Sequence, residues 1–133
     1  MERSLVISSH LTNINKVRIF LEKYFEEFSL SRDFFNHVFL GISEAVCNAI
    51  LHGNQLNTEK SVFIKLNLFG NQLHVEVEDE GDGFCDTLLF DPTLPENIKC
   101  ESGRGIYIIR QIADELVFKE DGRKIYMLFT IEE

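Results

Sequence analysis

The chain has no tryptophan, only two prolines and only three cysteines in 133 residues, and it has no excess of positive charge. Cys47, Cys85 and Cys100 are odd in number and far apart. A disulfide framework or a zinc site would use closely paired cysteines, so we expect reduced cysteines and a cytoplasmic protein. The formal net charge of −9 argues against a nucleic-acid surface, because phosphate backbones are bound by concentrated positive patches.

Long apolar segments are also missing. No run approaches the length of a membrane span, and no charged-then-apolar leader opens the chain, so we expect no membrane partner. Hydrophobic residues make up 44% of the chain and charged residues 26%, which is ordinary for a globular protein. The length suits a single domain over residues 1–133.

The spacing of apolar residues predicts a definite order of elements. That order is a short strand (Arg3 to Ser8), a helix capped by Thr12 or Asn13 and running to about Phe28, a second helix from Ser29 or Ser31 to Gly53, a hairpin (Lys60 to Phe69 and Gln72 to Asp79), a helix (Gly105 to Ala113) and a last hairpin (Glu115 to Lys119 and Lys124 to Ile131). The pattern breaks down from Gly81 to Ser102, where a loop of this length predicts a functional lid. The order predicts an α/β two-layer sandwich, with a mostly antiparallel sheet and helices on one face.

Three polar residues interrupt the apolar face of the second helix. Glu44, Asn48 and His52 recur every four residues, which places them on one stripe of a helix. A carboxylate one turn before a carboxamide can set a general base beside a neutral oxygen ligand for Mg²⁺. We expect His52 to cap the helix end or to pack against the lid, because no second His or Cys lies at ligand spacing.

Two glycine-rich segments follow in the sequence, DEGDGF (Asp79 to Phe84) and SGRGIYIIRQIAD (Ser102 to Asp114). The second sets two glycines and an arginine at the start of a helix, where backbone N–H groups and the helix dipole favour phosphate. These motifs also have ordinary alternatives. Glu44 and Asn48 could lie on a solvated helix face, and Asp79 could simply begin a turn. Their coincidence in this order favours an ATP site.

These segments resemble the motifs of the GHKL ATP-binding superfamily, the Bergerat fold shared by gyrase and histidine kinases. Glu44 to Gly53 is similar to its N box, Asp79 to Phe84 to its first glycine box, and Gly103 to Ile109 to its second. The likeness covers nearly the whole chain and is strongest to the small bacterial anti-sigma-factor serine/threonine kinases. The resemblance therefore implies a Bergerat fold and the use of ATP with Mg²⁺.

The resemblance also implies roles for individual residues. Glu44 would be the catalytic base and Asn48 the Mg²⁺ ligand. The residues that would bind ATP are Asp79, through the adenine amino group, Gly81 and Gly83 beside the base, and Gly103, Arg104 and Gly105 around the phosphates. In many relatives a Gly-Thr pair enters the last strand, whereas here Gly122 is followed by Arg123, which puts one secondary adenine contact in doubt.

The function that the resemblance implies is an anti-sigma factor that is also an ATP-dependent protein serine/threonine kinase. Its partners would be a sigma factor and a STAS-type anti-anti-sigma protein that carries the phosphorylated serine. Homodimer formation stays open. Two alternatives remain: a nucleotide-gated binding module without phosphotransfer, and a detached histidine-kinase ATP-binding domain. The carboxylate of Glu44 favours the kinase, because a module that only binds nucleotide would not need it.

Overall fold

The computed structural model of the chain describes residues 1–81 and 103–131. Its strands are β1 (Arg3–Ser8), β2 (Ser61–Phe69), β3 (Gln72–Glu78), β4 (Glu115–Lys119) and β5 (Lys124–Thr130). Its helices are α1 (Ile14–Glu27), α2 (Phe35–Asn48) and α4 (Gly103–Ile112), with short helical turns η1 (Leu11–Asn13), η2 (Arg32–Phe34), η3 (Ala49–Gly53) and η5 (Glu120–Gly122).

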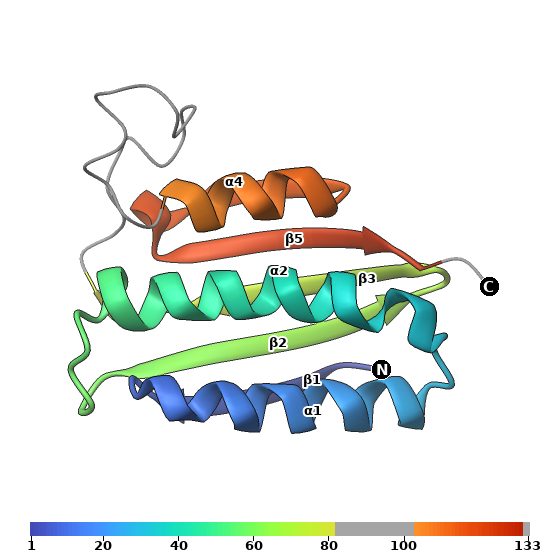
Figure 1. Cartoon of the computed structure of the whole chain (residues 1–133), viewed down its shortest axis with the longest axis horizontal. Helices are drawn as coiled ribbons and strands as arrows, with labels where there is room; N and C mark the ends of the chain where they lie inside the picture. The colour runs from blue at the N-terminus through green and yellow to red at the C-terminus, as the bar shows by residue number, and fades with distance from the viewer. Residues whose placement is uncertain (82–102, 132–133) are drawn as a thin grey trace.

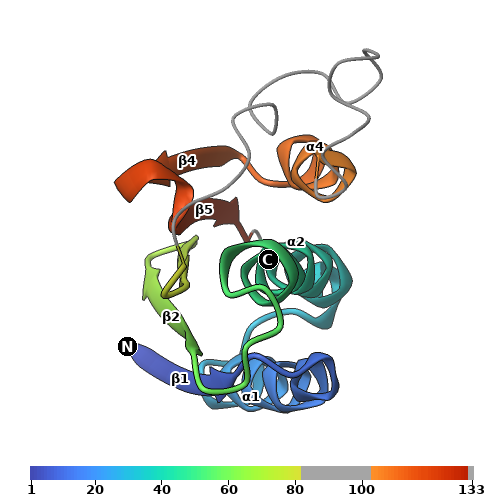
Figure 2. The same cartoon turned by 90° about the vertical axis from the view of Figure 1, so that its left-hand side faces the viewer.

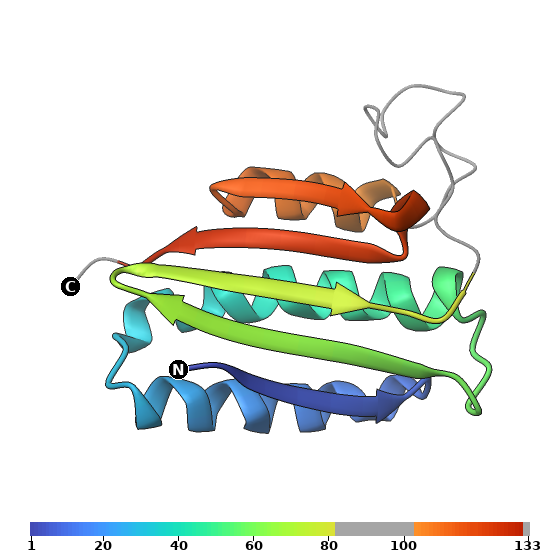
Figure 3. The same ribbon diagram turned by 180° about the vertical axis from the view of Figure 1, so that it is seen from behind.

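The five strands form one sheet in the order β1-β2-β3-β5-β4, and every neighbouring pair is antiparallel. Helices α1, α2 and α4 lie side by side over one face of this sheet (Figure 1). The end-on view shows two layers, helices on one side and strands on the other (Figure 2), and the opposite view shows the sheet with no helix in front of it (Figure 3). The predicted α/β two-layer sandwich is therefore confirmed.

The alternation of side chains along the strands decides which face of the sheet is covered. In β2 the residues Val62, Ile64, Leu66 and Leu68 are buried, and the residues between them point to the open face. Successive side chains of a strand point to opposite faces, so this pattern allows only one orientation of the strand against the helices.

The open face of the sheet carries polar cross-strand contacts beside exposed apolar side chains such as Phe63 and Phe69. Lys65 of β2 and Lys124 of β5 flank Glu76 of β3, with Nζ to Oε2 distances of 3.9 and 4.0 Å. His74 of β3 is hydrogen-bonded to the hydroxyl of Tyr126 on β5. These contacts suit a face that no helix covers.

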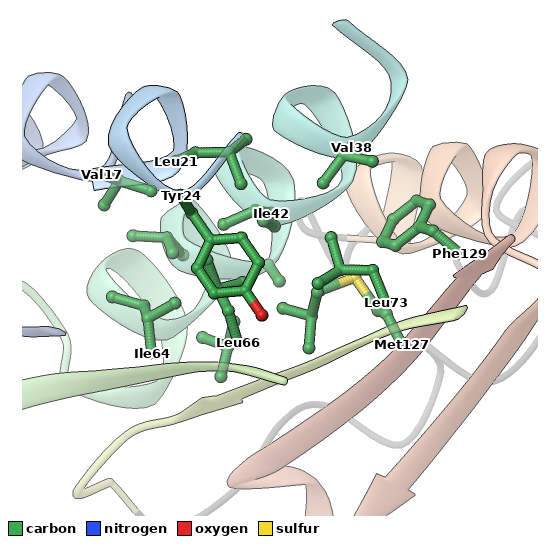
Figure 4. Close-up of a cluster of buried hydrophobic side chains, with 14 of the residues drawn as sticks. Val17, Leu21, Tyr24, Val38, Ile42, Ile64, Leu66, Leu73, Met127 and Phe129 are labelled. Carbon is green, nitrogen blue, oxygen red and sulfur yellow. The ribbon is translucent and has the colours of Figure 1, made fainter. Parts of the chain in front are cut away.

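The hydrophobic core fills the space between the two layers. Figure 4 shows Val17, Leu21 and Tyr24 of α1 and Val38 and Ile42 of α2 pointing toward the sheet residues Ile64, Leu66, Leu73, Met127 and Phe129. All of these side chains are less than 5% exposed. Because the helices and the strands bury their apolar sides against each other, neither layer would be stable alone.

The start of the first helix differs in part from the prediction. The backbone N–H of Thr12 donates to Nδ1 of His10 at 3.3 Å, so His10 caps the short turn η1 that precedes α1. Asn13 makes no capping hydrogen bond; its buried side-chain amide donates instead to the Ser8 carbonyl at 3.0 Å. Asn13 is the N-cap residue of α1, as expected, but its side chain binds the end of β1 and makes no capping hydrogen bond. The other expected cap, Ser31, is confirmed by its hydrogen bond from Asp33 N.

The helical stretch Arg32–Gly53 agrees with the predicted second helix, but it contradicts the expectation that no apolar run approaches the length of a membrane span. Its 22 residues, with a mean hydropathy of 1.4, would pass as a membrane span on length and composition alone. Half of the apolar window is buried inside the protein, and Figure 2 shows α2 lying on the sheet between α1 and α4. These features are those of a core helix of a globular domain.

Gly41 lets α2 approach the sheet closely. A Cβ atom on Gly41 would lie 2.7 Å from Cζ of Phe129 and 3.5 Å from Cδ1 of Ile112. We expect Gly41→Val to destabilise the fold by roughly 1–3 kcal/mol, because the buried ring of Phe129 would have to move. Urea unfolding measures the change. Asn36→Val, at an exposed position of the same helix, is the matched control and should stay within about 0.5 kcal/mol of the wild type.

Candidate nucleotide and catalytic site

Glu44 and Asn48 lie one turn apart in α2, as their spacing predicted. The side chain of Glu44 is half-buried, and its desolvation raises the pKa of its carboxyl group above the usual range. A raised pKa makes a carboxylate a better proton acceptor near neutral pH. Asn48 is only 4% exposed, and its Nδ2 has no hydrogen-bond partner in the part of the chain that the structure describes. A buried N–H donor without a partner is costly in a native protein, so Nδ2 is free to bind an acceptor; the proposed metal contact would use the amide oxygen instead.

Asp79 follows directly after β3 and is only 3% exposed. Its Oδ1 accepts a hydrogen bond from the backbone N–H of Gly81 at 2.7 Å, whereas its buried Oδ2 has no partner among the described residues. Burial raises the pKa of Asp79 to about 6, and the Gly81 hydrogen bond and the charges of Arg123 and Lys60 offset only part of this effect. Oδ2 is therefore a buried acceptor that can receive a donor from a ligand.

Two glycines allow Asp79 to lie against the end of α2. A Cβ atom on Gly53 would lie 2.3 Å from Oδ2 of Asp79, and one on Gly81 would lie 1.7 Å from the Gly53 carbonyl oxygen. A larger residue at Gly53 would displace the Asp79 carboxyl group, and one at Gly81 would force the backbone to move. The predicted role of Gly81 beside the nucleotide base stays a prediction, but its need for glycine follows from this close approach.

The end of α2 is not an ordinary helix end. Residues Ala49–Gly53 form the π-helical turn η3, and the N–H of Asn54 donates to the Ala49 carbonyl at 2.7 Å. The sequence correctly predicted that the helix ends at Gly53, but the wider turn could not be read from it. π-Turns recur at functional sites, and this one places Gly53 directly against the carboxyl group of Asp79.

The phosphate-binding segment is described only in part. Gly103 opens α4, and Arg104 and Gly105 lie in its first turn, so the helix begins two residues before the predicted start at Gly105. The structure describes the path of their backbone but not their side chains. Figures 1 and 3 place the start of α4 at the same end of the sandwich as the C-terminal ends of α2 and β3. Gly83 and the predicted lid between Gly81 and Ser102 lie outside the described residues.

Within the described residues, the ligand proposed for Mg²⁺ is the single side-chain oxygen of Asn48. No group of three or more His, Cys, Asp or Glu side chains within residues 1–81 and 103–131 could hold a metal. A single neutral amide oxygen, such as that of Asn48, is suited to Mg²⁺ when phosphate and water complete the octahedron. The residues present therefore fit a metal that arrives with a nucleotide.

Two other residues of the N-box segment fit supporting roles. Cys47 is half-buried, and burial together with the nearby Glu44 raises the pKa of its thiol, so the thiol stays protonated and unreactive. His52 is half-buried in the last turn of the helical segment, where capping was expected. Sequence reasoning missed that Gly53 packs against Asp79 and that Asn54 binds the backbone of the next residue, Glu80. The Gly-Asn pair at the helix end was the available signal, but it reads equally well as an ordinary helix stop.

An antiparallel sheet covered on one face by helices, with this N-box helix and a glycine-bounded buried carboxyl, defines the GHKL class of ATP-binding domains. The chain belongs to the family described as "Histidine kinase-like ATPase domain", whose match spans residues 7–129. The match runs from Ile7, near the end of β1, to Phe129 in β5 and includes every proposed site residue.

Individual relatives support the same assignment. The chain is 27% identical over 128 residues to the protein named "Serine-protein kinase RsbW" of Staphylococcus epidermidis, covering 90% of this chain and 80% of that protein. It is 29% identical over 120 residues to "Anti-sigma F factor" of Bacillus subtilis, covering 86% and 80%. The crystal structure of the RsbU and RsbW domains of a Mycobacterium tuberculosis protein matches with a TM-score of 0.68 over 99% of this chain but only 32% of that longer chain. At 14% identity this last likeness shows the fold alone.

The raised pKa of Asp79 predicts a pH-dependent stability. The native state holds the Asp79 proton between the ordinary pKa of 3.8 and about pH 6. The contribution of this group to stability is therefore complete below pH 3.8 and is lost as the pH rises through about 6. Above that pH, Asp79→Asn should stabilise the nucleotide-free protein by up to about 3 kcal/mol, since each pKa unit corresponds to about 1.4 kcal/mol.

Urea unfolding across this pH range tests the prediction. The gain from Asp79→Asn should shrink toward zero at the acidic end, where the wild-type carboxyl is already protonated. Glu59→Gln, which neutralises an exposed carboxylate, is the control and should show no such gain. A loss of stability in Asp79→Asn at neutral pH would show that the buried, ionised carboxyl group does not destabilise the native state.

Proposed function

We propose that this chain is an ATP-dependent protein serine/threonine kinase that acts as an anti-sigma factor and phosphorylates a STAS-type anti-anti-sigma partner. The observation that carries the proposal is the buried carboxyl of Asp79, which has one oxygen without a partner among residues 1–81 and 103–131 and two glycines packed around it. A carboxylate in this state is an acceptor ready for the amino group of adenine. The family membership and the two named relatives support the activity.

Each proposed residue has a role that its surroundings suit. Asp79 accepts a hydrogen bond from adenine, and Gly81 and Gly83 leave room for the base. Asn48 contributes its amide oxygen to Mg²⁺, which neutralises phosphate charge when bound. Backbone N–H groups at Gly103 and Gly105 and the guanidinium of Arg104 bind the phosphates.

Glu44 is the proposed general base, one helical turn from the proposed metal ligand. Its carboxylate accepts the proton of the attacking serine hydroxyl as the phosphoryl group moves to the serine oxygen. Partial burial, which raises the pKa of Glu44, strengthens it for this task. In this proposal the protein binds two partners, a sigma factor and the STAS protein that it phosphorylates, and it acts in the cytoplasm. Residues 1–133 act as one ATP-binding domain.

The proposal is tested by transfer of labelled γ-phosphate to STAS proteins of the same genome. Glu44→Gln should lose about 10²–10⁴-fold in transfer rate, the usual contribution of a general base, while its affinity for ATP stays near that of the wild type. Glu26→Gln, on the exposed side of α1, is the control and should transfer at the wild-type rate.

Equal rates in wild type and Glu44→Gln would exclude Glu44 as the base. A wild-type protein that binds ATP and a sigma factor but transfers no phosphate would instead be a nucleotide-gated binding module. Transfer to a histidine rather than a serine would favour the detached histidine-kinase domain.

The role of Asn48 is tested through the metal. Asn48→Ala should weaken binding of ATP with Mg²⁺ by about tenfold or more, since a good ligand contributes at least as much as a charged hydrogen bond. Binding of ATP in excess chelator should change far less. Isothermal calorimetry measures both affinities, and equal losses with and without Mg²⁺ would remove Asn48 from the metal site.

A further inference from the structure

Asn54 is a fully buried polar residue that the proposed mechanism does not use. It follows the turn η3 directly and is only 1% exposed. Its side-chain amide donates to Oγ of Ser9 at 2.8 Å and to the carbonyl of Ser61 at 2.9 Å. Its Oδ1 accepts a hydrogen bond from the backbone N–H of Glu80 at 2.8 Å. Both amide hydrogens and the amide oxygen are thus used, each by a different segment of the chain.

These hydrogen bonds join four places that are far apart in the sequence. The backbone of Asn54 closes the π-turn at the end of α2, and its side chain reaches the residue after β1, the first residue of β2 and the residue after Asp79. Ser9 is itself held, because its hydroxyl donates to the Lys60 carbonyl at 2.7 Å. The anchor for the Asp79 segment is therefore rigid.

The position of Asp79 depends on the backbone on both of its sides. On one side the N–H of Asp79 donates to the Arg123 carbonyl at 2.9 Å, which ties the end of β3 to the start of β5. On the other side the only hydrogen bond described for the N–H of Glu80 is the one to Asn54. The Asp79 carboxyl then accepts from Gly81 inside the same short segment, which cannot fix that segment relative to the rest of the protein.

We propose that Asn54 is a positioning residue that fixes the Asp79–Gly81 segment and so makes the nucleotide site selective for adenine over guanine. The inference rests on the proposed nucleotide site. Adenine presents an amino donor at the position where guanine presents a carbonyl oxygen. A carboxylate that is held in place accepts a hydrogen bond from the adenine amino group and repels the guanine carbonyl oxygen. A carboxylate on a loose loop can move away from that oxygen and so discriminates less. Discrimination of this kind depends on polar groups that cannot relax.

The test compares the affinities of Asn54→Ala and the wild type for ATP and GTP, both with Mg²⁺, by calorimetry at a temperature where circular dichroism shows the variant folded. We expect ATP affinity to fall about tenfold, in line with the loss of a buried hydrogen bond and its geometry, with GTP affinity nearly unchanged. The ATP-to-GTP preference should therefore shrink by about tenfold. The transfer rate at saturating ATP should stay within about twofold, because Asn54 touches none of the reacting groups.

Asn13→Ala is the matched control. Asn13 is also a buried asparagine, and its amide donates to the carbonyl and the hydroxyl of Ser8 at 3.0 and 2.9 Å, but it makes no described contact with the Asp79 segment. The control should lose stability as Asn54→Ala does while keeping the wild-type nucleotide preference. If both variants lose stability and neither changes the ATP-to-GTP preference, Asn54 has a structural role alone and the inference is wrong.

A milder variant covers the case in which Asn54→Ala does not fold. Ser9→Ala removes one acceptor of the Asn54 amide and leaves the Glu80 hydrogen bond in place. It should reduce the preference by about two- to threefold, as a partial loosening would, and an unchanged preference in this folded variant would overturn the inference. Asp79→Asn separates the two proposals. Unchanged ATP affinity in Asp79→Asn would refute the nucleotide site itself, whereas lost affinity there with wild-type preference in Asn54→Ala would refute only the role of Asn54.

Discussion

The site depends on one carboxyl group that is buried before any ligand arrives. Asp79 lies where the ends of α2 and β3 meet, with one oxygen bound to Gly81 and the other without a partner among the described residues. Burial of a carboxylate is unfavourable, as its raised pKa shows. The rest of the fold supplies the stability that this arrangement costs, through a core that joins three helices to five strands. A ligand that donates to the free oxygen relieves part of the cost on binding.

Close backbone packing makes this placement possible. The chain leaves α2 through a π-turn, which sets Gly53 against Asp79, and Gly81 passes so near the Gly53 carbonyl that a side chain cannot be accommodated. Asn54 then joins the helix end to Ser9, Ser61 and Glu80 through three hydrogen bonds, of which the one to Ser9 is buried and the other two are partly buried. Polar groups in such a network are stable only when all are satisfied, so the site is rigid where the base would bind.

The helix that packs on the covered face of the sheet also carries two of the proposed site residues. Apolar residues of β2 and β3 pack against the helices, and the proposed site residues Glu44 and Asn48 belong to the same helix that fills the core. Helix α2 therefore uses two different stripes of its surface. One stripe packs on the sheet, and the other carries Glu44 and Asn48. Figure 1 shows that α2 ends at the same end of the sandwich as β3 ends and α4 begins.

The sequence by itself determined the elements, the layer order and the identity of the motif residues. Strand alternation such as that from Val62 to Leu68 and the helical period of α2 are local patterns, and side-chain burial follows them directly. The sequence also indicated Glu44, Asn48 and Asp79, because their spacing and order are visible along the chain. Only the tertiary structure decided that the Asn13 side chain would bind Ser8 instead of making a capping hydrogen bond, that α2 would end in a π-turn, and that Asn54 would hold the Asp79 segment. These three outcomes depend on partners 5 to 45 positions away, and no local pattern specifies which buried amide meets which strand end.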